Sequence, residues 1–477
     1  MEQGRGRGSR WQRQTLSFSL LVLFMPLAAL GISEALPNPP ALRSQVEFWK
    51  AIFARYRTTQ VVVHDSENLD RIYSVLDFSA EKENLAGDLL PAYIQIRVDQ
   101  EKDRIRGLLL RLHQNGGRAE PWSAEQAKLA KLFEADPDPA KFLAAADPTR
   151  IRAQRGLREK FQEGVRISRR YLPEMERIFR AEGVPVEITR LPLVESTFNV
   201  RAYSKAGAAG IWQFIPATAK LFLRIDEQID ERREPIAATR AAAAFLRRNY
   251  ERLGTWPLAI TAYNHGPVGV QRAVEALGTR DIVEIVRRYR GPKFGFASRN
   301  FYAEFLAAVE VDRDYRQHFG ELAFARPVAA REVVLREPVP FAALAQAARM
   351  PAEELAEWNL ALTPTVVSGK LPVPAGYELK LPPHRAAEFE TRYAAWRAQR
   401  RAAAQLAQAK PRAKRGVAGS ARAAEVAARR THRVQRGQTL LSIARHYGTT
   451  VEKLQRKNRL RPGSPLRAGQ VLVIPEG

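Results

Sequence analysis

The spacing of apolar positions divides the chain into a long helical part and a C-terminal part of a different kind. In residues 36–180 apolar side chains recur at helical intervals, which predicts mostly helices. The clearest set is Ile105, Leu108, Leu109 and Leu112. A run of three valines at 61–63 fits either type of element, and Asp-Pro pairs near residues 136–148 predict loops. We expect a helical region that packs on the next domain and carries no chemistry of its own.

Residues 181–320 form a denser apolar block with prolines and glycines at the expected helix ends. Pro216 and Pro235 stand where prolines open helices, and Gly254 stands where the second of these helices ends. Thr255 is a candidate N-cap for a further helix. Apolar and polar residues do not alternate over any long stretch, so the pattern predicts an all-α domain.

The C-terminal third contains an internal repeat. Four residues recur after 99 positions and four others after 93, so the first copy has six extra residues around 363–369. The matched pairs are Phe341 and Leu440, Leu344 and Ile443, Leu355 and Leu454, Asn359 and Asn458, Gly376 and Gly469, Leu379 and Leu472, Leu381 and Ile474, and Pro382 and Pro475. Each copy predicts the order strand, helix, helix, strand, which is a small α+β unit.

Charge narrows the choice of partners. The chain of 477 residues has 76 Lys and Arg against 51 Asp and Glu, a net charge of +25, which favours nucleic acid, anionic lipid or an acidic polymer. Between the two copies, twelve basic residues face three acidic ones over 385–430, which predicts a helix to about residue 406 and then a flexible basic linker. The absence of cysteine excludes disulfides, thiolate metal sites and cysteine nucleophiles.

The first 35 residues carry an export pattern. Arginines at positions 5, 7, 10 and 13 precede an apolar run over 16–32, and Ser33-Glu34-Ala35 offers small residues where a signal peptidase reads them. The interpretation is a signal peptide over residues 1–35. The alternative is an uncleaved anchor, since the run approaches the length that spans a bilayer. Both place the rest of the chain outside the cytoplasm, which argues against nucleic acid as the partner.

One carboxyl group stands in markedly apolar surroundings. Glu195 follows the apolar run 191–194, and no acidic residue comes after it until Asp226. Apolar surroundings raise the pKa of a carboxyl group, which can then act as a general acid near neutral pH. Neutral hydrogen-bonding side chains of the kind that bind sugars are Gln213, Tyr263, Asn264 and Tyr302. Taken alone, a glutamate between apolar residues is more often the solvent-facing position of a helix.

Several short motifs around this glutamate occur in a fixed order. They are Glu195-Ser196, Phe198-Asn199, Ser204, Ala206-Gly207-Ala208, Gly210 to Gln213, Pro216 to Ala219, Ala262-Tyr263-Asn264 and Phe301-Tyr302. The series spans about residues 170–315 and resembles the catalytic domain of the soluble-type lytic transglycosylases, which has a lysozyme-like fold. It departs from the family pattern at Val200, where proline is usual, and at His265, where alanine is common.

The resemblance implies a substrate, a reaction and a set of residues. The substrate would be the glycan strand of bacterial peptidoglycan, cut between N-acetylmuramic acid and N-acetylglucosamine without water, with anhydromuramic acid as the product. Glu195 would be the single acid/base catalyst, and Ser204 would orient it. The sugar would be held by Gln213, Tyr263, Asn264 and Tyr302. The resemblance implies no cofactor and no metal ion.

Two other functions stay open at this point. One is hydrolysis of the same bond, as in goose-type lysozyme, with Asp226 or Asp230 positioning a water molecule. The other is a wall-binding protein whose enzyme domain is inactive. The products of digested wall separate the first alternative from a transglycosylase, and comparison of a Glu195→Gln variant with the parent separates the second.

The second C-terminal copy resembles a LysM module over residues 431–477. The matching positions are Val434 to Leu440, Ile443-Ala444, Asn458, Gly469-Gln470 and Ile474-Pro475. LysM modules recognise glycans that contain N-acetylglucosamine, so the resemblance implies glycan contacts at Gly437, Thr439 and Asn458. For Thr439 and Asn458, a structural role in a turn or at a helix cap is an equally good interpretation. The first copy is degenerate, because Pro338-Val339-Pro340 replaces the Gly-x-Thr turn.

The predicted fold class is mainly α, with a lysozyme-like all-α catalytic domain, a helical N-terminal region and small α+β modules. The expected parts are a signal peptide (1–35), a helical region (36–169), the catalytic domain (170–315), a degenerate LysM-like module (330–383), a basic linker (384–430) and a LysM module (431–477). The expected location is the periplasm or cell envelope, with peptidoglycan as the partner. Association with a membrane through the N-terminal segment or the basic linker remains an open alternative.

Overall fold

The computed structural model describes residues 35–85, 87–115, 123–327, 329–409, 431–461 and 465–475. The expected signal peptide, apart from Ala35, and the second half of the expected linker lie outside these ranges. Helices dominate and the sheets are small and antiparallel, which confirms the predicted fold class. Among the residues placed, no helix combines the length and apolar character of a membrane span. The chain forms two compact units, divided between Glu390 and Thr391.

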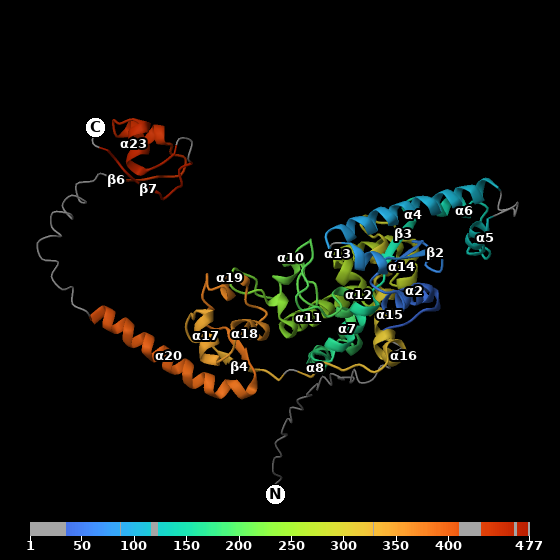
Figure 1. Cartoon of the computed structure of the whole chain (residues 1–477), viewed down its shortest axis with the longest axis horizontal. Coiled ribbons are helices and arrows are strands. Elements are labelled where there is room, and N and C mark those ends of the chain that lie inside the picture. Colours follow the sequence, from blue (N-terminus) through green and yellow to red (C-terminus); the bar gives the residue numbers. More distant parts are fainter. Residues whose placement is uncertain are drawn as a thin grey trace, which may run out of the picture. The chain divides into compact units, whose positions relative to one another are not determined.

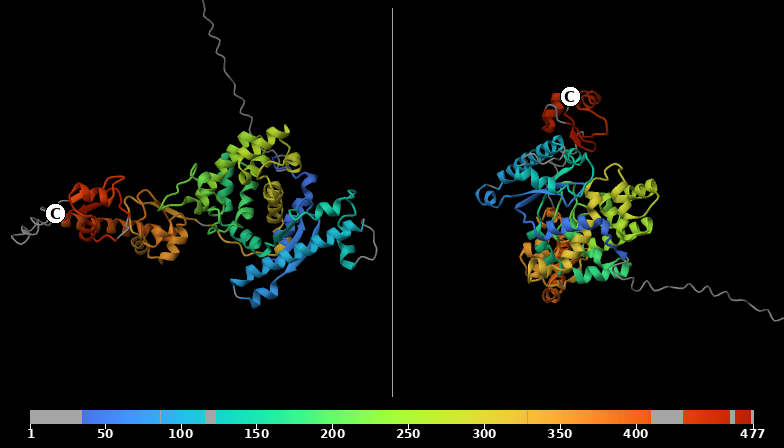
Figure 2. Two further views of the ribbon diagram at one scale, coloured as in Figure 1. Left: turned by 90° about the horizontal axis from the view of Figure 1, so that it is seen from above. Right: turned by 90° about the vertical axis from the view of Figure 1, so that its right-hand side faces the viewer.

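The largest hydrophobic core that the described residues of the first unit form includes residues from Leu36 to Val311. Figures 1 and 2 show the helices that surround it. The helices that build it are α2 (Arg43–Ala54), α7 (Arg158–Ser168), α8 (Leu172–Glu182), α9 (Leu191–Glu195), α11 (Pro235–Leu253), α12 (Trp256–His265), α13 (Pro267–Leu277), α14 (Ile282–Arg288) and α15 (Phe296–Arg313). Helix α2 packs along α15 despite their separation in the sequence. The core therefore crosses the boundary that we expected at residue 170 between N-terminal region and catalytic domain.

The ends of the core helices follow local sequence signals. Helix α11 begins at Pro235 and ends before Gly254, whose φ of 83° is the left-handed conformation that glycine adopts without strain. Thr255 occupies the N-cap position of α12, but its side chain makes no cap hydrogen bond. Helix α10 (Pro216–Ala219) is one turn long, shorter than the helix that we expected to open there.

A three-stranded antiparallel sheet interrupts the N-terminal helices. Its order is β2 (Ile72–Asp77), β1 (Gln60–Asp65) and β3 (Ile151–Arg155), with Val62 opposite Val75 and Gln154. The valine run at 61–63 is thus the central strand. Val62 joins the main core, and its two neighbours face smaller clusters around the long helix α4 (Leu89–Gln114) (Figure 1).

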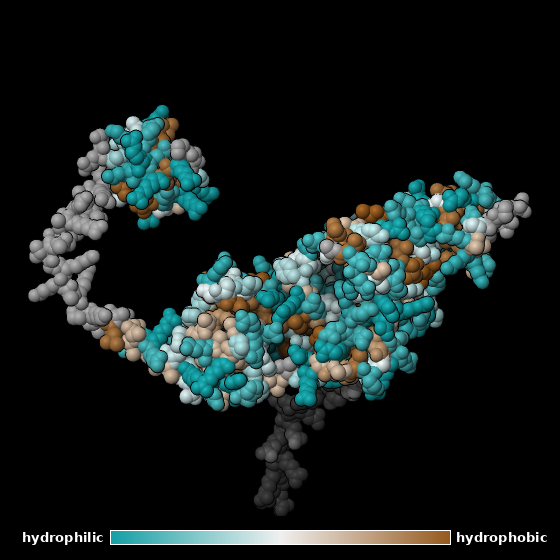
Figure 3. Space-filling model, viewed as in Figure 1, coloured by the Kyte–Doolittle hydropathy of each residue, from teal (hydrophilic) through white to brown (hydrophobic). Residues whose placement is uncertain are grey.

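The remaining helices before residue 320 are short. They are η1 (Pro40–Leu42), α3 (Ser79–Asn84), α5 (Ala124–Lys131), α6 (Lys141–Ala145), η2 (Val186–Arg190), η3 (Glu231–Arg233) and α16 (Tyr315–Phe319). On the face seen in Figure 3, hydrophilic residues dominate and hydrophobic residues form separate small areas. This distribution agrees with the high share of charged residues in the chain.

Both C-terminal copies have the predicted order of elements. The first copy comprises β4 (Arg331–Val334), α17 (Phe341–Ala348), α18 (Ala352–Trp358), the added helix α19 (Pro364–Val367) and β5 (Glu378–Leu381). The second copy comprises β6 (Thr431–Arg433), α22 (Leu440–His446), α23 (Val451–Asn458) and β7 (Val471–Val473). In each copy the two strands pair antiparallel. Helix α20 (Pro383–Ala409) follows the first copy and covers the first half of the expected linker.

An asparagine joins the second helix to the last strand in each copy. The Nδ2 of Asn359 donates to the carbonyl oxygens of Leu355 (2.9 Å) and Lys380 (3.0 Å), and its Oδ1 accepts from the N–H of Lys380 (2.9 Å). Asn458 makes the same pattern of three hydrogen bonds around Val473. The two copies therefore share one internal architecture, and Asn458 has a structural duty.

The extra residues of the first copy connect it to the core of the first unit. Just before α19, the N–H of Thr363 donates to the carbonyl oxygen of Gln228 (3.0 Å), and the N–H of Asp230 donates to that of Ala361 (2.7 Å). The hydroxyl of Thr363 donates to the carbonyl oxygen of Glu227 (2.7 Å). These bonds fasten the module to the loop that leads into α11.

Candidate active site

Glu195 is the last residue of α9, whose preceding residues are apolar. Leu191 and Leu193 are fully buried, and the hydroxyl of Ser196 donates to the carbonyl oxygen of Ile211 (2.9 Å), which ties the end of α9 to the next loop. The Glu195 side chain is partly exposed, and burial in this apolar setting raises its pKa to about 8. The carboxyl group therefore keeps its proton at neutral pH, which is the state that a general acid requires.

The loop after Glu195 has an unusual backbone. Thr197, Phe198 and Gln213 have φ of 51°, 55° and 49°, a region that residues other than glycine rarely adopt. Phe198 is fully buried, so packing fixes this conformation. Residues held in sparsely populated backbone conformations concentrate at functional sites, and here three of them lie within one loop beside the candidate catalyst.

The structure gives Ser204 a partner within its own loop. Its Oγ accepts a hydrogen bond from the N–H of Ala208 (3.0 Å), and its backbone pairs with the same residue and with Gly207. Ser204 thus closes a tight turn. Among the described residues no hydrogen bond joins it to Glu195. No direct contact therefore supports the expected role of Ser204 in orienting Glu195.

Gln213 and Tyr263 both hydrogen-bond to the backbone of the segment 210–212. The Nε2 of Gln213 donates to the carbonyl oxygen of Gly210 (2.8 Å), and the hydroxyl of Tyr263 donates to that of Trp212 (2.8 Å). Burial and the nearby carboxylate of Glu195 raise the pKa of Tyr263 well above its usual value. The phenol therefore stays neutral and lies within electrostatic reach of Glu195.

Asn264 and His265 meet at Ser298, on α15. The hydroxyl of Ser298 donates to the Oδ1 of Asn264 (3.2 Å) and lies 3.1 Å from the Nδ1 of His265. Burial lowers the pKa of His265. Asn264 is exposed, and its Oδ1 is engaged by the hydrogen bond from Ser298.

Tyr302, on α15, is almost fully buried. Its side chain is 1% exposed, and its hydroxyl donates to the carbonyl oxygen of Pro37 (2.7 Å). This hydrogen bond forms part of the packing of α15 against the segment that precedes α2, and the sugar-holding role of Tyr302 stays a prediction.

A second carboxyl group, which the sequence analysis missed, belongs to this site. Glu304 lies on α15, which packs against α9, and burial together with the nearby charge of Glu195 raises its pKa to about 8. It stands among buried residues of the FYAEFLAA run of α15. A lone acid in an apolar helical run was the available signal, the same one that singled out Glu195.

The two aspartates of the hydrolytic alternative serve local structure. Asp226 accepts hydrogen bonds from the N–H groups of Gln228 and Ile229 (both 2.8 Å). Asp230 forms a two-point ion pair with Arg232, in which the Nε–Oδ1 distance is 2.9 Å and the Nη2–Oδ2 distance is 2.7 Å. Both carboxylates are thus occupied in shaping the loop before α11.

The predicted glycan contacts of the second copy have structural partners. Thr439 caps α22, because its Oγ1 accepts from the N–H of Ser442 (3.2 Å) in a reciprocal capping box. Gly437 is exposed and has a φ of 88°. Asn458 is held by the three bonds described above. Within the described ranges no group of His, Asp or Glu side chains has the arrangement of a metal site.

Comparison with known proteins assigns two segments. Residues 176–286 match the family model of the transglycosylase SLT domain, and residues 432–475 match that of the LysM domain. Membrane-bound lytic murein transglycosylase D from Escherichia coli strain K12 is 28% identical over 310 residues, which is 62% of each chain. The chain thus spans less than two thirds of the length of this curated relative.

Two solved structures are more distant. The soluble lytic transglycosylase SLT70 from Escherichia coli is 22% identical with a TM-score of 0.26, over 30% of this chain and 24% of its own. The lytic transglycosylase Slt from Pseudomonas aeruginosa is 20% identical with a TM-score of 0.24, over 31% and 24%. The two family models and the curated relative, rather than these structures, show that the chain carries a transglycosylase SLT domain and a C-terminal LysM domain and is homologous to membrane-bound lytic murein transglycosylase D.

Proposed function

We propose that this protein is a peptidoglycan lytic transglycosylase with Glu195 as its catalyst. The observation that most strongly supports this proposal is the pKa of Glu195, which is raised to about 8. Glu195 lies inside the SLT domain, in an apolar site beside Tyr263. A protonated carboxyl group there can donate its proton at neutral pH. The match to the SLT domain and the homology to a lytic murein transglycosylase support the same reaction.

In the first step, Glu195 protonates the oxygen that bridges N-acetylmuramic acid and N-acetylglucosamine. The glycosidic bond breaks, the N-acetylglucosamine side leaves with a new hydroxyl, and positive charge develops at the anomeric carbon of the muramic acid. The acetamido group of that sugar shelters the charge. Gln213 and Asn264 are our candidates for holding sugar groups, because their side chains are neutral and add no charge to the site.

In the second step, the ionised Glu195 removes a proton from the primary hydroxyl of the muramic acid. The resulting oxygen attacks the anomeric carbon of the same sugar and closes the anhydro ring. The carboxyl group regains its proton, and no water is consumed. Attack from within one molecule gains from a high effective molarity, which offsets the lack of a separate carboxylate nucleophile.

Hydrolysis is a second candidate because Glu304 lies near Glu195. Hydrolytic glycosidases pair an acid with a second carboxylate that attacks the sugar or activates water. Burial raises the pKa of Glu304 to about 8 as well. At neutral pH Glu304 is therefore mostly protonated, which makes it a poor nucleophile and base. This favours the lytic reaction over the hydrolytic one.

The products decide between these functions. Purified sacculi are digested with the parent protein and with a Glu195→Gln variant, and the released fragments are weighed by mass spectrometry. The lytic reaction gives anhydromuramic acid ends, and hydrolysis gives reducing ends that are heavier by one water. Release of fragments by neither protein, with binding of both to sacculi, would overturn the enzymatic proposal in favour of a wall-binding protein.

The location that we propose is the cell envelope, with peptidoglycan as the partner. The LysM domain and the homology to a protein named as membrane-bound support it. Attachment to a membrane through residues 16–32 or through the basic stretch after α20 is part of the same proposal. The net charge of +25 favours a polyanionic surface.

A further inference from the structure

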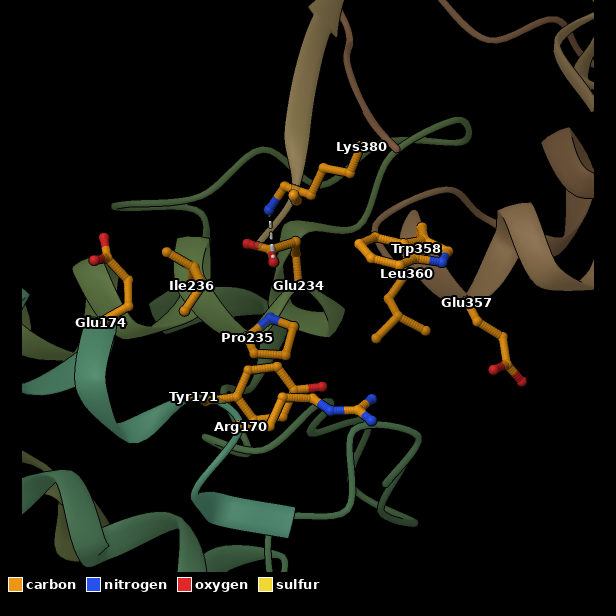
Figure 4. A pocket seen from close by; sticks show the side chains of 11 residues that line it. Arg170, Tyr171, Glu174, Glu234, Pro235, Ile236, Glu357, Trp358, Leu360 and Lys380 are labelled. Carbon is orange, nitrogen blue, oxygen red and sulfur yellow. Dashed lines mark ion pairs between the residues drawn. The ribbon is translucent and has the colours of Figure 1, made fainter. Parts of the chain in front are cut away.

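A cavity of ≈ 330 Å³ lies between the first C-terminal module and the helices α8 and α11 (Figure 4). Its wall includes Tyr171, Glu234, Pro235, Trp358, Leu360 and Lys380. Glu195 is not among its lining residues, so this is a site apart from the candidate active site. Cavities of this size hold small ligands or single segments of a polymer.

The wall combines aromatic faces with a polar rim. Trp358 and Leu360 approach from the module, and Tyr171 and Pro235 lie on the opposite side (Figure 4). Trp358 is half-buried, so part of its ring remains available to a ligand. Aromatic rings with nearby polar groups suit a sugar, whose ring has an apolar face and a hydroxylated edge.

Most charges of the wall are paired, and among its described charged side chains Arg170 alone has no carboxylate partner. The Nζ of Lys380 lies 2.8 Å from the Oε1 of Glu234, whose other oxygen accepts from the N–H of Ala237 (2.5 Å). The two further acidic residues of the lining are also paired. Glu174 pairs with Arg177 and Glu357 with Arg201, both at 2.6 Å. An anionic stem peptide would meet one unpaired positive charge, that of Arg170, so the aromatic faces rather than the charges favour an N-acetylglucosamine residue as the ligand.

The repeat shows that the module does not need a tryptophan at this position. The residue of the second copy that matches Trp358 is Lys457, and the residue that matches Leu360 is Arg459. The second copy forms the same pair of helices and the same pair of strands with these charged residues. The apolar pair of the first copy is therefore an addition to the shared architecture.

The cavity is also held rigidly. Trp358 precedes Asn359, whose three hydrogen bonds fix the end of α18 to β5. On the other wall, Glu234 caps α11 through the N–H of Ala237. A binding site built on anchored elements loses little conformational entropy when it takes up a ligand.

We propose that this cavity binds an N-acetylglucosamine residue of a glycan strand outside the catalytic centre, with Trp358 as the stacking surface. The ligand class rests on the proposed function. The degenerate first module then contributes to glycan binding through its junction with α8 and α11, and a strand that occupies the cavity is held while another part of it is cut.

The test uses the full chain with Glu195→Gln and chitotetraose, the tetramer of N-acetylglucosamine, as the probe. Hydrogen–deuterium exchange is followed with and without the probe. We expect protection in segments 353–361 and 376–382 and at the start of α11. Trp358→Lys, which copies the second module, and Trp358→Ala should each raise the half-saturating concentration for this protection at least about tenfold. Trp396→Ala on α20, outside the cavity, is the matched control and should leave it unchanged.

The outcomes separate this inference from the proposed function. Protection confined to the loop around Gln213 or to residues 431–475 would overturn the cavity as a glycan site, even where sacculi yield anhydro ends. Protection by an anionic stem peptide instead of chitotetraose would overturn the choice of ligand. Protection that depends on Trp358 supports the inference even if the sacculus products show no lytic reaction, which would refute the proposed function alone.

Discussion

At Glu195 the requirements of catalysis and of stability oppose each other. Its folded-state pKa of about 8 lies above the ordinary value of 4.5, so its stabilising contribution is complete below about pH 4.5 and is lost as the pH rises through 8. Glu195→Gln has no such loss. We expect the variant to exceed the parent in free energy of unfolding by about 2 kcal/mol above pH 8, discounted for partial exposure, with no difference at pH 4. Denaturant titrations at both pH values measure this, and equal curves at high pH would contradict it.

Glu304 distinguishes a one-carboxyl mechanism from a two-carboxyl mechanism. Its pKa is raised to about 8, so it is mostly protonated at neutral pH, and glutamine has nearly the shape and charge of that protonated form. We therefore expect Glu304→Gln to keep kcat on sacculi within about threefold of the parent at pH 6–7, while Glu195→Gln loses at least about a thousandfold. Turnover assays on both variants measure this. Comparable losses in the two would instead support hydrolysis by a carboxyl pair.

The site residues differ in how far the sequence could predict them. Glu195 stood out because no acidic residue follows it until Asp226 and its neighbours are apolar, and the structure gives it the raised pKa that we predicted. The sequence did not reveal that α15 brings Glu304 near it, because that pairing depends on helix packing across the chain. The hydrogen bond from Tyr302 to Pro37 could not be predicted for the same reason, since only packing brings these two residues together.

At the scale of elements, the loop after α9 depends on one close approach. Gly210 has a φ of 72°, and a Cβ there would lie 1.9 Å from the carbonyl oxygen of Arg232. Gly210→Ala should therefore cost about 3 kcal/mol, from backbone strain and from displacement of the loop before α11. Gly207→Ala is the matched control, because it has a similar φ of 79° but its nearest contact is 4.0 Å away. It should cost only about 1 kcal/mol. Thermal unfolding measures both, and equal costs would contradict the role of the close approach.

Helices were predictable at this scale because their signals are local. Prolines, glycines and apolar spacing placed α11 and α12 nearly as the structure has them. The sheet was not predictable, since three valines carry no periodicity of their own and β3 pairs with β1 across the intervening α4. The repeat was predictable because two copies of one pattern reinforce each other. The role of Thr363, at the start of the extra residues, in bonding to Gln228 required the structure.

At the scale of the whole molecule, the two modules have different relations to the rest of the chain. The first module belongs to the same compact unit as the SLT domain, and hydrogen bonds fasten it to the loop before α11. The second belongs to the other unit and has its own small core around Leu454 and Leu472. Removal of the first should therefore disturb the fold that carries the candidate active site, and removal of the second should disturb only binding.

Deletion of residues 431–477 tests this asymmetry. We expect the shortened protein to keep the melting temperature of the first unit and the parent's kcat/KM on short soluble glycan fragments, because the SLT domain and its core lie before residue 391. On insoluble sacculi the rate should fall about tenfold or more, since a second binding site raises the effective concentration of the enzyme at the wall. Deletion of residues 329–382 is the comparison, and it should lower the melting temperature and both rates because Gln228 and Asp230 lose their partners. Equal effects of the two deletions on soluble fragments would show that the modules are interchangeable and would refute the asymmetry.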